Sequence, residues 1–238
     1  MSKTEHNPRY GGRARVALKT LALFIAVIAI GAEAGDPLPK GPMLNLDFQR
    51  IEDGLIPSKT LYPLYVPMGE LSTEIFNNRT MLLFEEGHGL DIPHSSLLDP
   101  DGSEWVAMIR VLALTDGMVM SQCDDEKGYA IYIKDGAIQA AIHTGHSTII
   151  LKERPENGIT PCLNKWVTIE VKINSDMALL ILNRAHVALI PLEEPLSGKD
   201  YRIRIGEHET LPAPLRRSKT ANPTGFTGAV SSLKLTRQ

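Results

Sequence analysis

The stretch Gly128–Ile142, G-Y-A-I-Y-I-K-D-G-A-I-Q-A-A-I, decides the fold class of this chain. Two runs rich in Ile, Tyr and Ala flank the pair Asp135-Gly136. Asp-Gly between two such runs is a strong hairpin signal, because a type I′ turn needs positive φ at both central residues. Alternation sets Tyr129, Ile131 and Ile133 on one face of the predicted hairpin.

The rest of the chain has the same character. Lys165–Ile173 alternates most regularly, with Val and Ile on one face, and Asn183-Arg184 marks a second tight hairpin. Residues 51–79 and 207–224 contain many breakers, so we expect loops there, with one short strand around 64–66. About a dozen short strands and no long helical period predict an all-β sandwich or barrel. The other expected strands are 43–48, 80–85, 90–92, 104–112, 117–123, 147–152, 178–182, 185–189, 201–205 and 228–235.

The charge is distributed unevenly. The chain carries a formal net charge of −3, and residues 1–34 carry five basic and two acidic side chains, or +3. The remaining residues therefore carry −6. A mildly acidic domain without a basic stripe is a poor partner for nucleic acid, so we expect none.

The N-terminus has the pattern of an export signal. Basic residues precede the apolar run Leu21–Ile30, and Ala32-Glu33-Ala34 follows it as a small-x-small cleavage site. The run is too short to span a bilayer comfortably, which takes roughly 20 residues. We expect a signal peptide and no stable membrane span after cleavage, with an uncleaved signal anchor as the alternative.

These features divide the chain into a signal peptide (1–34), a Pro/Gly linker (35–42) and one domain (43–238). The expected location is secreted or periplasmic, within the cell envelope.

Seven segments resemble, in order, the motifs of laminin-G-like, concanavalin A-like jelly-roll domains. They lie at 79–98, 104–111, 117–142, 164–173, 179–188, 203–207 and 225–235. In the hairpin of the fifth segment, Asn183-Arg184 stands where the family usually has Asp-Gly. The resemblance implies a two-sheet antiparallel β-sandwich of the jelly-roll type over residues 43–238. It does not fix the function, because this fold hosts lectins, adhesion modules and glycanases.

Candidate metal ligands are few. Domains of the resembled family often hold calcium at the sandwich rim, and Asp124, Asp125 and Glu126 form the densest acidic cluster. The alternative, which acidic clusters of this kind favour over calcium, is a solvated loop. His143 and His146 have a His-x-x-His spacing that suits zinc, although a hairpin loop also accounts for it.

Two cysteines, Cys123 and Cys162, lie in the exported region, and an even count there favours a disulfide over two free thiols. Trp105 and Trp166 each begin a strand whose alternation turns them away from the Val/Ile face. Exposed Trp stacks on sugar rings, so both are weak candidates for a binding face, with burial under a loop as the alternative.

A glycanase of this fold needs several carboxylates on one strand, and Glu170 stands alone on its face. We therefore expect a non-catalytic binding module for carbohydrate or a glycosylated surface. The alternatives are an envelope protein-interaction or structural domain, and a divergent glycan-degrading enzyme.

Overall fold

The Asp135-Gly136 hairpin forms as predicted and lies inside one of two large sheets. Asp135 and Gly136 have φ of 54° and 70°, as a type I′ turn requires. The carboxylate of Asp116 accepts hydrogen bonds from both turn amides, at 2.7 and 3.0 Å. The computed structural model describes residues 40–60, 64–124, 126–153, 161–206, 214 and 225–238, which belong to one unit beginning at Leu38.

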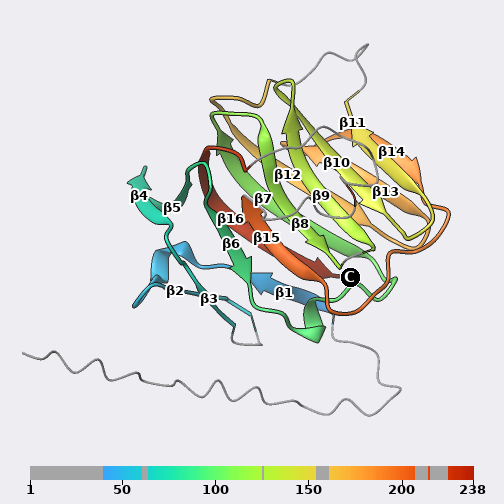
Figure 1. Ribbon diagram of the computed structural model, residues 1–238, viewed down its shortest axis with the longest axis horizontal. Coiled ribbons are helices and arrows are strands. Elements are labelled where there is room, and N and C mark those ends of the chain that lie inside the picture. Colours follow the sequence, from blue (N-terminus) through green and yellow to red (C-terminus); the bar gives the residue numbers. More distant parts are fainter. Residues whose placement is uncertain (1–39, 61–63, 125, 154–160, 207–213, 215–224) are drawn as a thin grey trace, which may run out of the picture. The chain divides into compact units, whose positions relative to one another are not determined.

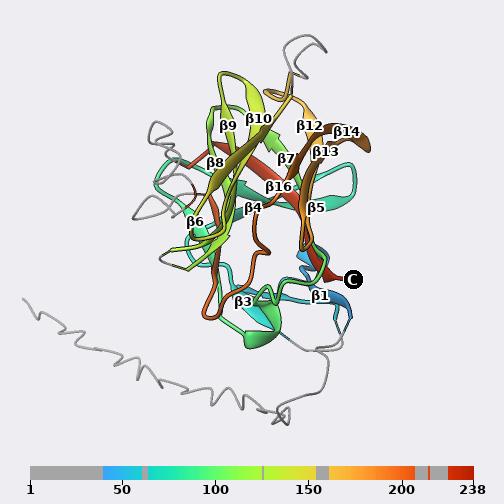
Figure 2. The ribbon, with the colours of Figure 1, turned by 90° about the vertical axis from the view of Figure 1, so that its right-hand side faces the viewer.

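The described residues form two large antiparallel sheets that stack as a sandwich (Figures 1 and 2). The eight-stranded sheet has the order β14-β13-β12-β7-β16-β5-β4, and β1 also pairs with β16. Its strands are β1 (Gly41–Asn45), β4 (Ser72–Phe76), β5 (Arg79–Phe84), β7 (Trp105–Ala113), β12 (Trp166–Ile173), β13 (Met177–Leu182), β14 (Ala185–Pro191) and β16 (Gly228–Arg237).

The six-stranded sheet has the order β11-β10-β9-β8-β15-β6 and contains the central hairpin. Its strands are β6 (Gly89–Ile92), β8 (Gly117–Cys123), β9 (Gly128–Lys134), β10 (Ala137–His143), β11 (Thr148–Lys152) and β15 (Arg202–Gly206). The smaller elements are the pair β2 (Leu55–Pro57) and β3 (Tyr65–Pro67), and the 3-10 helices η1 (Phe48–Arg50) and η2 (Ser96–Leu98).

One apolar core fills the space between the two sheets. Val167, Ile169 and Val171 of β12 enter it from one side, and Ile131 and Ile133 of β9 from the other. Each strand thus contributes alternate residues, which is how a two-layer sandwich buries its inner faces. The all-β jelly-roll expectation is confirmed.

The opposite face of the central hairpin is also buried. Met118, Ala130, Tyr132 and Ala141 form a second, smaller apolar cluster on the outer side of the six-stranded sheet. The alternation predicted for the hairpin is therefore correct, and both of its faces are packed.

Residues 51–79 are more regular than the sequence suggested. They contain β2, β3 and β4, and Asn77 and Asn78 form a further left-handed hairpin turn with φ of 49° and 59°. Pro57 and Pro67 are the last residues of β2 and β3, where a two-stranded ribbon tolerates proline because both strands are edges. β1 begins at Gly41, two residues before the strand expected at 43–48.

Within the described residues no helix is long and apolar enough to cross a membrane. The predicted signal peptide and most of the predicted linker lie outside the described residues, so both stay predictions.

Candidate functional site

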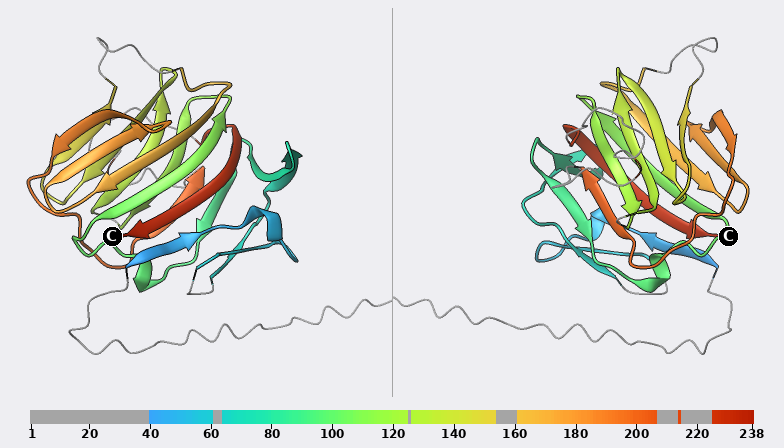
Figure 3. Two further views of the ribbon diagram at one scale, coloured as in Figure 1. Left: turned by 180° about the vertical axis from the view of Figure 1, so that it is seen from behind. Right: turned by 45° about the vertical axis from the view of Figure 1, so that its right-hand side comes forward.

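The outer face of the eight-stranded sheet carries the polar and aromatic residues that alternation excludes from the core. On β12 the buried residues Val167 and Ile169 alternate with Trp166, Thr168 and Glu170, which are partly exposed. The left view of Figure 3 shows β16, β7, β12 and β13 lying side by side across this part of the molecule. A functional surface here rests on regular strands and is therefore rigid.

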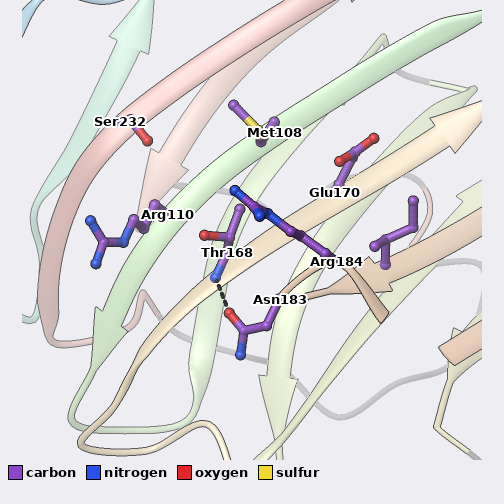
Figure 4. A pocket seen from close by; sticks show the side chains of 8 residues that line it. Met108, Arg110, Thr168, Glu170, Asn183, Arg184 and Ser232 are labelled. Carbon is purple, nitrogen blue, oxygen red and sulfur yellow. Dashed lines mark hydrogen bonds between the residues drawn. The ribbon is translucent and has the colours of Figure 1, made fainter. Parts of the chain in front are cut away.

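Strand register aligns these side chains in rows. Arg110 lies opposite Thr168 of β12 and opposite Ser232 of β16, while Glu170 lies opposite Met108. Adjacent strands are about 4.8 Å apart, so each row is a contiguous strip of side chains. The strips border an open hollow of about 450 Å³, lined by Met108, Arg110, Thr168, Glu170, Ile181, Asn183, Arg184 and Ser232 (Figure 4).

The turn between β13 and β14 fixes one wall of this hollow. Asn183 and Arg184 both have positive φ, of 50° and 73°. The amide of Asn183 donates to the carbonyl of Thr168 at 2.9 Å, and the amide of Thr168 donates to Oδ1 of Asn183 at 3.0 Å. This reciprocal pair ties the turn to β12, and Arg184 extends from it along the hollow (Figure 4).

A second hollow adjoins the first and shares Arg110 with it. The Arg110 guanidinium lies 5.1 Å from the centroid of the Trp166 ring, within the range of a cation–π contact. The hollow measures about 340 Å³ and is lined by Phe76, Asn77, Arg79, Met81, Arg110, Trp166 and Ser231. Phe76 is 50% exposed and adds a second aromatic surface.

The two hollows are rich in cations. Arg79, Arg110 and Arg184 line them, and Glu170 is their one carboxylate among the lining residues described. Lys172 lies 3.2 Å from that carboxylate and neutralises it. Guanidinium groups donate bidentate hydrogen bonds, and aromatic faces stack on the apolar side of a sugar ring. The surface therefore suits binding, and its described lining residues include no carboxylate pair of the kind that glycoside hydrolysis uses.

Of the two tryptophans, the structure places one on this face. Trp166 lies on the outer side as predicted, but Trp105 is buried at 1% exposure, which corrects its assignment to an outward face. Trp105 has the same parity along β7 as Ile109 and Val111, which point into the core, and its indole N–H donates to Gln122 at 2.8 Å.

The predicted Cys123–Cys162 disulfide is also corrected. Cys123 pairs with Gly128 at one end of β9, whereas the thiol of Cys162 donates to the carbonyl of Gly136, beyond its other end. β9 has seven residues, so its ends are six steps apart, or about 20 Å at roughly 3.3 Å per step. A disulfide needs Cα atoms within about 7 Å, so the two buried cysteines do not pair with each other.

The two histidines of the His-x-x-His motif point to different partners. Nδ1 of the buried His143 lies 2.8 Å from the hydroxyl of Thr148. Nδ1 of the exposed His146 lies 3.0 Å from the carboxylate of Glu194. The motif lies where β10 ends and turns toward β11, and the zinc hypothesis stays a prediction.

The acidic loop uses its first carboxylate to close its own turn. Oδ1 of Asp124 accepts from the amides of Glu126 and Lys127, at 2.7 and 2.6 Å. Asp125 lies outside the described residues. Among the residues described, no three His, Cys, Asp or Glu side chains gather to hold a metal ion. The calcium hypothesis stays a prediction.

Sequence reasoning missed most of the residues that line the hollows. Arg184 is predicted only as part of a hairpin turn, and Arg110 and Phe76 are not predicted site residues, because a single Arg or Phe at an outward strand position carries no motif. The alternation along β7 could have identified Arg110, because it stands between the buried residues Ile109 and Val111 and therefore points to the outer face.

Comparisons with solved structures agree with the jelly-roll architecture. The chain is similar to mouse laminin α1 domains LG4-5, at 14% identity and a TM-score of 0.52, covering 73% of this chain and 42% of that one. It is similar to the binding domain of Paraclostridial Mosquitocidal Protein 1, at 11% identity and a TM-score of 0.61, covering 83% and 49%.

A third similar structure is from botulinum neurotoxin type C, at 14% identity and a TM-score of 0.58, covering 82% of this chain and 47% of that one. Its description states that cell entry of the toxin depends upon interaction with two ganglioside molecules. The chain thus spans about half the length of the solved structures it matches, and no curated protein matches it in sequence.

The laminin G domain family model matches residues 112–238, which is more than half of the chain. The matched part contains β8 to β16, including the central hairpin and the β12 strand that carries Trp166. Together with the antiparallel sandwich, this match shows that the chain belongs to the laminin G domain family.

Proposed function

We propose that this laminin G domain is a non-catalytic binding module that recognises carbohydrate through the outer face of its eight-stranded sheet. The observation that carries the proposal is the Arg110 guanidinium against the Trp166 ring, where the two hollows meet. A sugar stacked beside Trp166 would present its hydroxyl or carboxylate oxygens to Arg110 and Arg184. The ganglioside interaction described for the neurotoxin type C structure supports a carbohydrate ligand by analogy of fold alone.

The positive character of the face favours glycans that contain acidic sugars over neutral ones. Charge-assisted bonds from Arg to a carboxylate are roughly twice as strong as neutral hydrogen bonds. The protein as a whole carries net negative charge, so attraction of an anionic glycan requires a local cationic surface such as this one.

The test is binding to a panel of neutral and acidic glycans by calorimetry, with Trp166→Ala and Arg110→Ala as variants. The matched control is Arg202→Ala, an exposed arginine on β15 of the other sheet. We expect each face variant to weaken binding at least tenfold, or about 1.4 kcal/mol, and the control to bind like the wild type. Equal binding by all four proteins would refute this location of the site.

Repeating the binding measurements with EDTA distinguishes a calcium-dependent site at the Asp124–Glu126 loop from a site on the outer face of the sheet. Binding that EDTA abolishes, and that the face variants leave unchanged, would move the ligand to the Asp124–Glu126 loop. Binding that resists EDTA and falls in Trp166→Ala supports the sheet face.

We also propose that the protein is exported, on the pattern of residues 1–34. Cell fractionation and N-terminal sequencing of the purified protein test this. A mature N-terminus near residue 35 outside the cytoplasm supports export, whereas intact chain in the cytoplasm refutes it.

A further inference from the structure

β4 is an edge strand, and no other strand among the described residues pairs with its outer side. All five of its residues, Ser72–Phe76, are exposed, and it stands at the end of the eight-stranded sheet (Figure 1). Ile75 is 74% exposed and Phe76 is 50% exposed, although both are large apolar side chains. An exposed apolar edge strand is a template for pairing with another strand.

The hairpin geometry shows which backbone groups are available. β4 and β5 are joined by the two-residue turn Asn77-Asn78, so the flanking pair Phe76–Arg79 exchanges both hydrogen bonds. Bonded and non-bonded pairs alternate along the ladder, and Glu74 therefore also bonds to β5. The amides and carbonyls of Thr73 and Ile75 point the other way, toward the free edge.

The opposite edge of the same sheet is protected, which makes β4 stand out. The pairing of β14 with β13 contains a register shift at Leu180/Ile181, and β14 ends at Pro191. Bulges and prolines discourage pairing between sheet edges. β4 pairs with β5 in unbroken register, and it contains no proline.

We propose that β4 pairs antiparallel with β4 of a second copy, about a two-fold axis at Ile75. This register sets the two Ile75 side chains directly opposite each other and buries apolar surface that is now exposed. It pairs Glu74 with Phe76 of the other copy. A two-fold at Glu74 would instead oppose two carboxylates, and like charges directly opposite destabilise a sheet.

The charge distribution along β4 is complementary to itself in this arrangement. Glu74 lies at the centre of β4, and Glu70, with an 88% exposed side chain, precedes the strand. Arg79 follows the turn and pairs with Phe76 across the hairpin. The proposed register sets Glu74 of each copy beside Phe76 of the other, one strand away from Arg79, so opposite charges approach on both sides of the two-fold axis.

Self-association does not rest on the proposed carbohydrate function. A short edge buries less than a standard interface, so we expect a weak dimer that depends on concentration. If the outer face also binds glycan, the dimer presents two such faces side by side, which raises the avidity for a glycan-coated surface.

Sedimentation velocity over a concentration series tests the proposal on the purified protein. We expect the wild type to shift from monomer to dimer, and Ile75→Lys and Thr73→Pro to stay monomeric with unchanged thermal midpoints. Proline is tolerated at Thr73 because its amide faces the free edge. Leu189→Lys, at a 57% exposed apolar residue of β14, is the matched control and should dimerise like the wild type.

A cross-link tests the register. Residues of a bonded antiparallel pair have Cα atoms about 5.5 Å apart, within reach of a disulfide. Ile75→Cys should form a disulfide-linked dimer under mild oxidation, and Glu74→Cys should not. A wild type that stays monomeric at all concentrations, or loss of dimer in Leu189→Lys alone, overturns the proposal. Preferential cross-linking of Glu74→Cys overturns the register.

Discussion

Replacing Gln122 by Met should destabilise the protein severely, although the two side chains have similar volume. Gln122 is fully buried, and its side chain makes three hydrogen bonds. Oε1 accepts from the indole of Trp105 and from the hydroxyl of Tyr129, both at 2.8 Å, and the amide donates to the carbonyl of Leu98. Gln122 thereby joins β7, β8 and β9 to the η2 loop inside the core.

The magnitude follows from counting the groups left unpaired. Methionine removes the partner of two donors and one acceptor, and each unsatisfied buried group costs about 1–3 kcal/mol. Local relaxation recovers part of this sum, so we expect a loss of roughly 3–6 kcal/mol. That is a large part of the stability of a typical domain, about 5–15 kcal/mol.

The assay is urea unfolding followed by tryptophan fluorescence and circular dichroism, with Gln139→Met as the matched control. Gln139 is a partly exposed glutamine of β10 that accepts one bond, from Tyr132 at 2.9 Å. Loss of this single hydrogen bond should lower the free energy of unfolding by about 0.5–1.5 kcal/mol. Adding Tyr129→Phe to Gln122→Met should recover stability, because it removes a donor already unpaired. A difference below about 1 kcal/mol between the two Gln→Met variants would refute the reasoning.

The remaining predictions concern a glycine and the cysteines. Gly128→Ala should lower the stability by at least about 2 kcal/mol in urea unfolding, because Gly128 has φ of +138° and a Cβ there would clash with Cβ of Cys123. A neutral effect would contradict this. Both thiols should react with a thiol-specific dye only after unfolding, and a protein with no reactive thiol in denaturant would instead contain the disulfide. Burial, together with the charge of Asp116, raises the pKa of the Cys162 thiol to about 11. The folded state thus holds this proton more tightly than the unfolded state, with its pKa near 9.0, so the contribution of Cys162 to stability is complete below pH 9 and disappears as the pH rises to 11. Cys162→Ala should show a smaller loss of stability than the wild type across that interval.

The parts of the fold that the sequence predicts well are those where local chemistry and burial agree. Asp135-Gly136 forms the expected turn because Asp and Gly tolerate positive φ, and Asn183 begins the second expected turn for the same reason. β12 forms where its alternation is most regular, since each inward Val or Ile is buried by the opposite sheet. In these places the backbone preferences of the residues and the burial of their apolar side chains predict the same structure.

The failures arise where the outcome depends on distant partners. The role of Cys162 depends on Gly136, which is 26 positions earlier in the chain. The breakers in residues 51–79 predict a loop, yet Pro57 and Pro67 belong to a ribbon in which only one edge of each strand needs hydrogen bonds. Trp105 and Ile109 are four positions apart on β7, so their side chains lie on the same side of the sheet. The burial of Trp105 could therefore have been predicted from the sequence.

The position of Arg110 explains why a binding face can exist on the middle of a sheet. Arg110 projects from β7, which is paired on both sides by β12 and β16, so its backbone cannot move without breaking two ladders. The Trp166 ring restrains its guanidinium, and the tied Asn183 turn supports Arg184 across the hollow. Ordering a long cationic side chain costs about 0.5–1.5 kcal/mol on binding. Because the fold has already ordered Arg110, less of that cost remains when a ligand binds, and the removal of Trp166 should weaken binding even for ligands that never touch the ring.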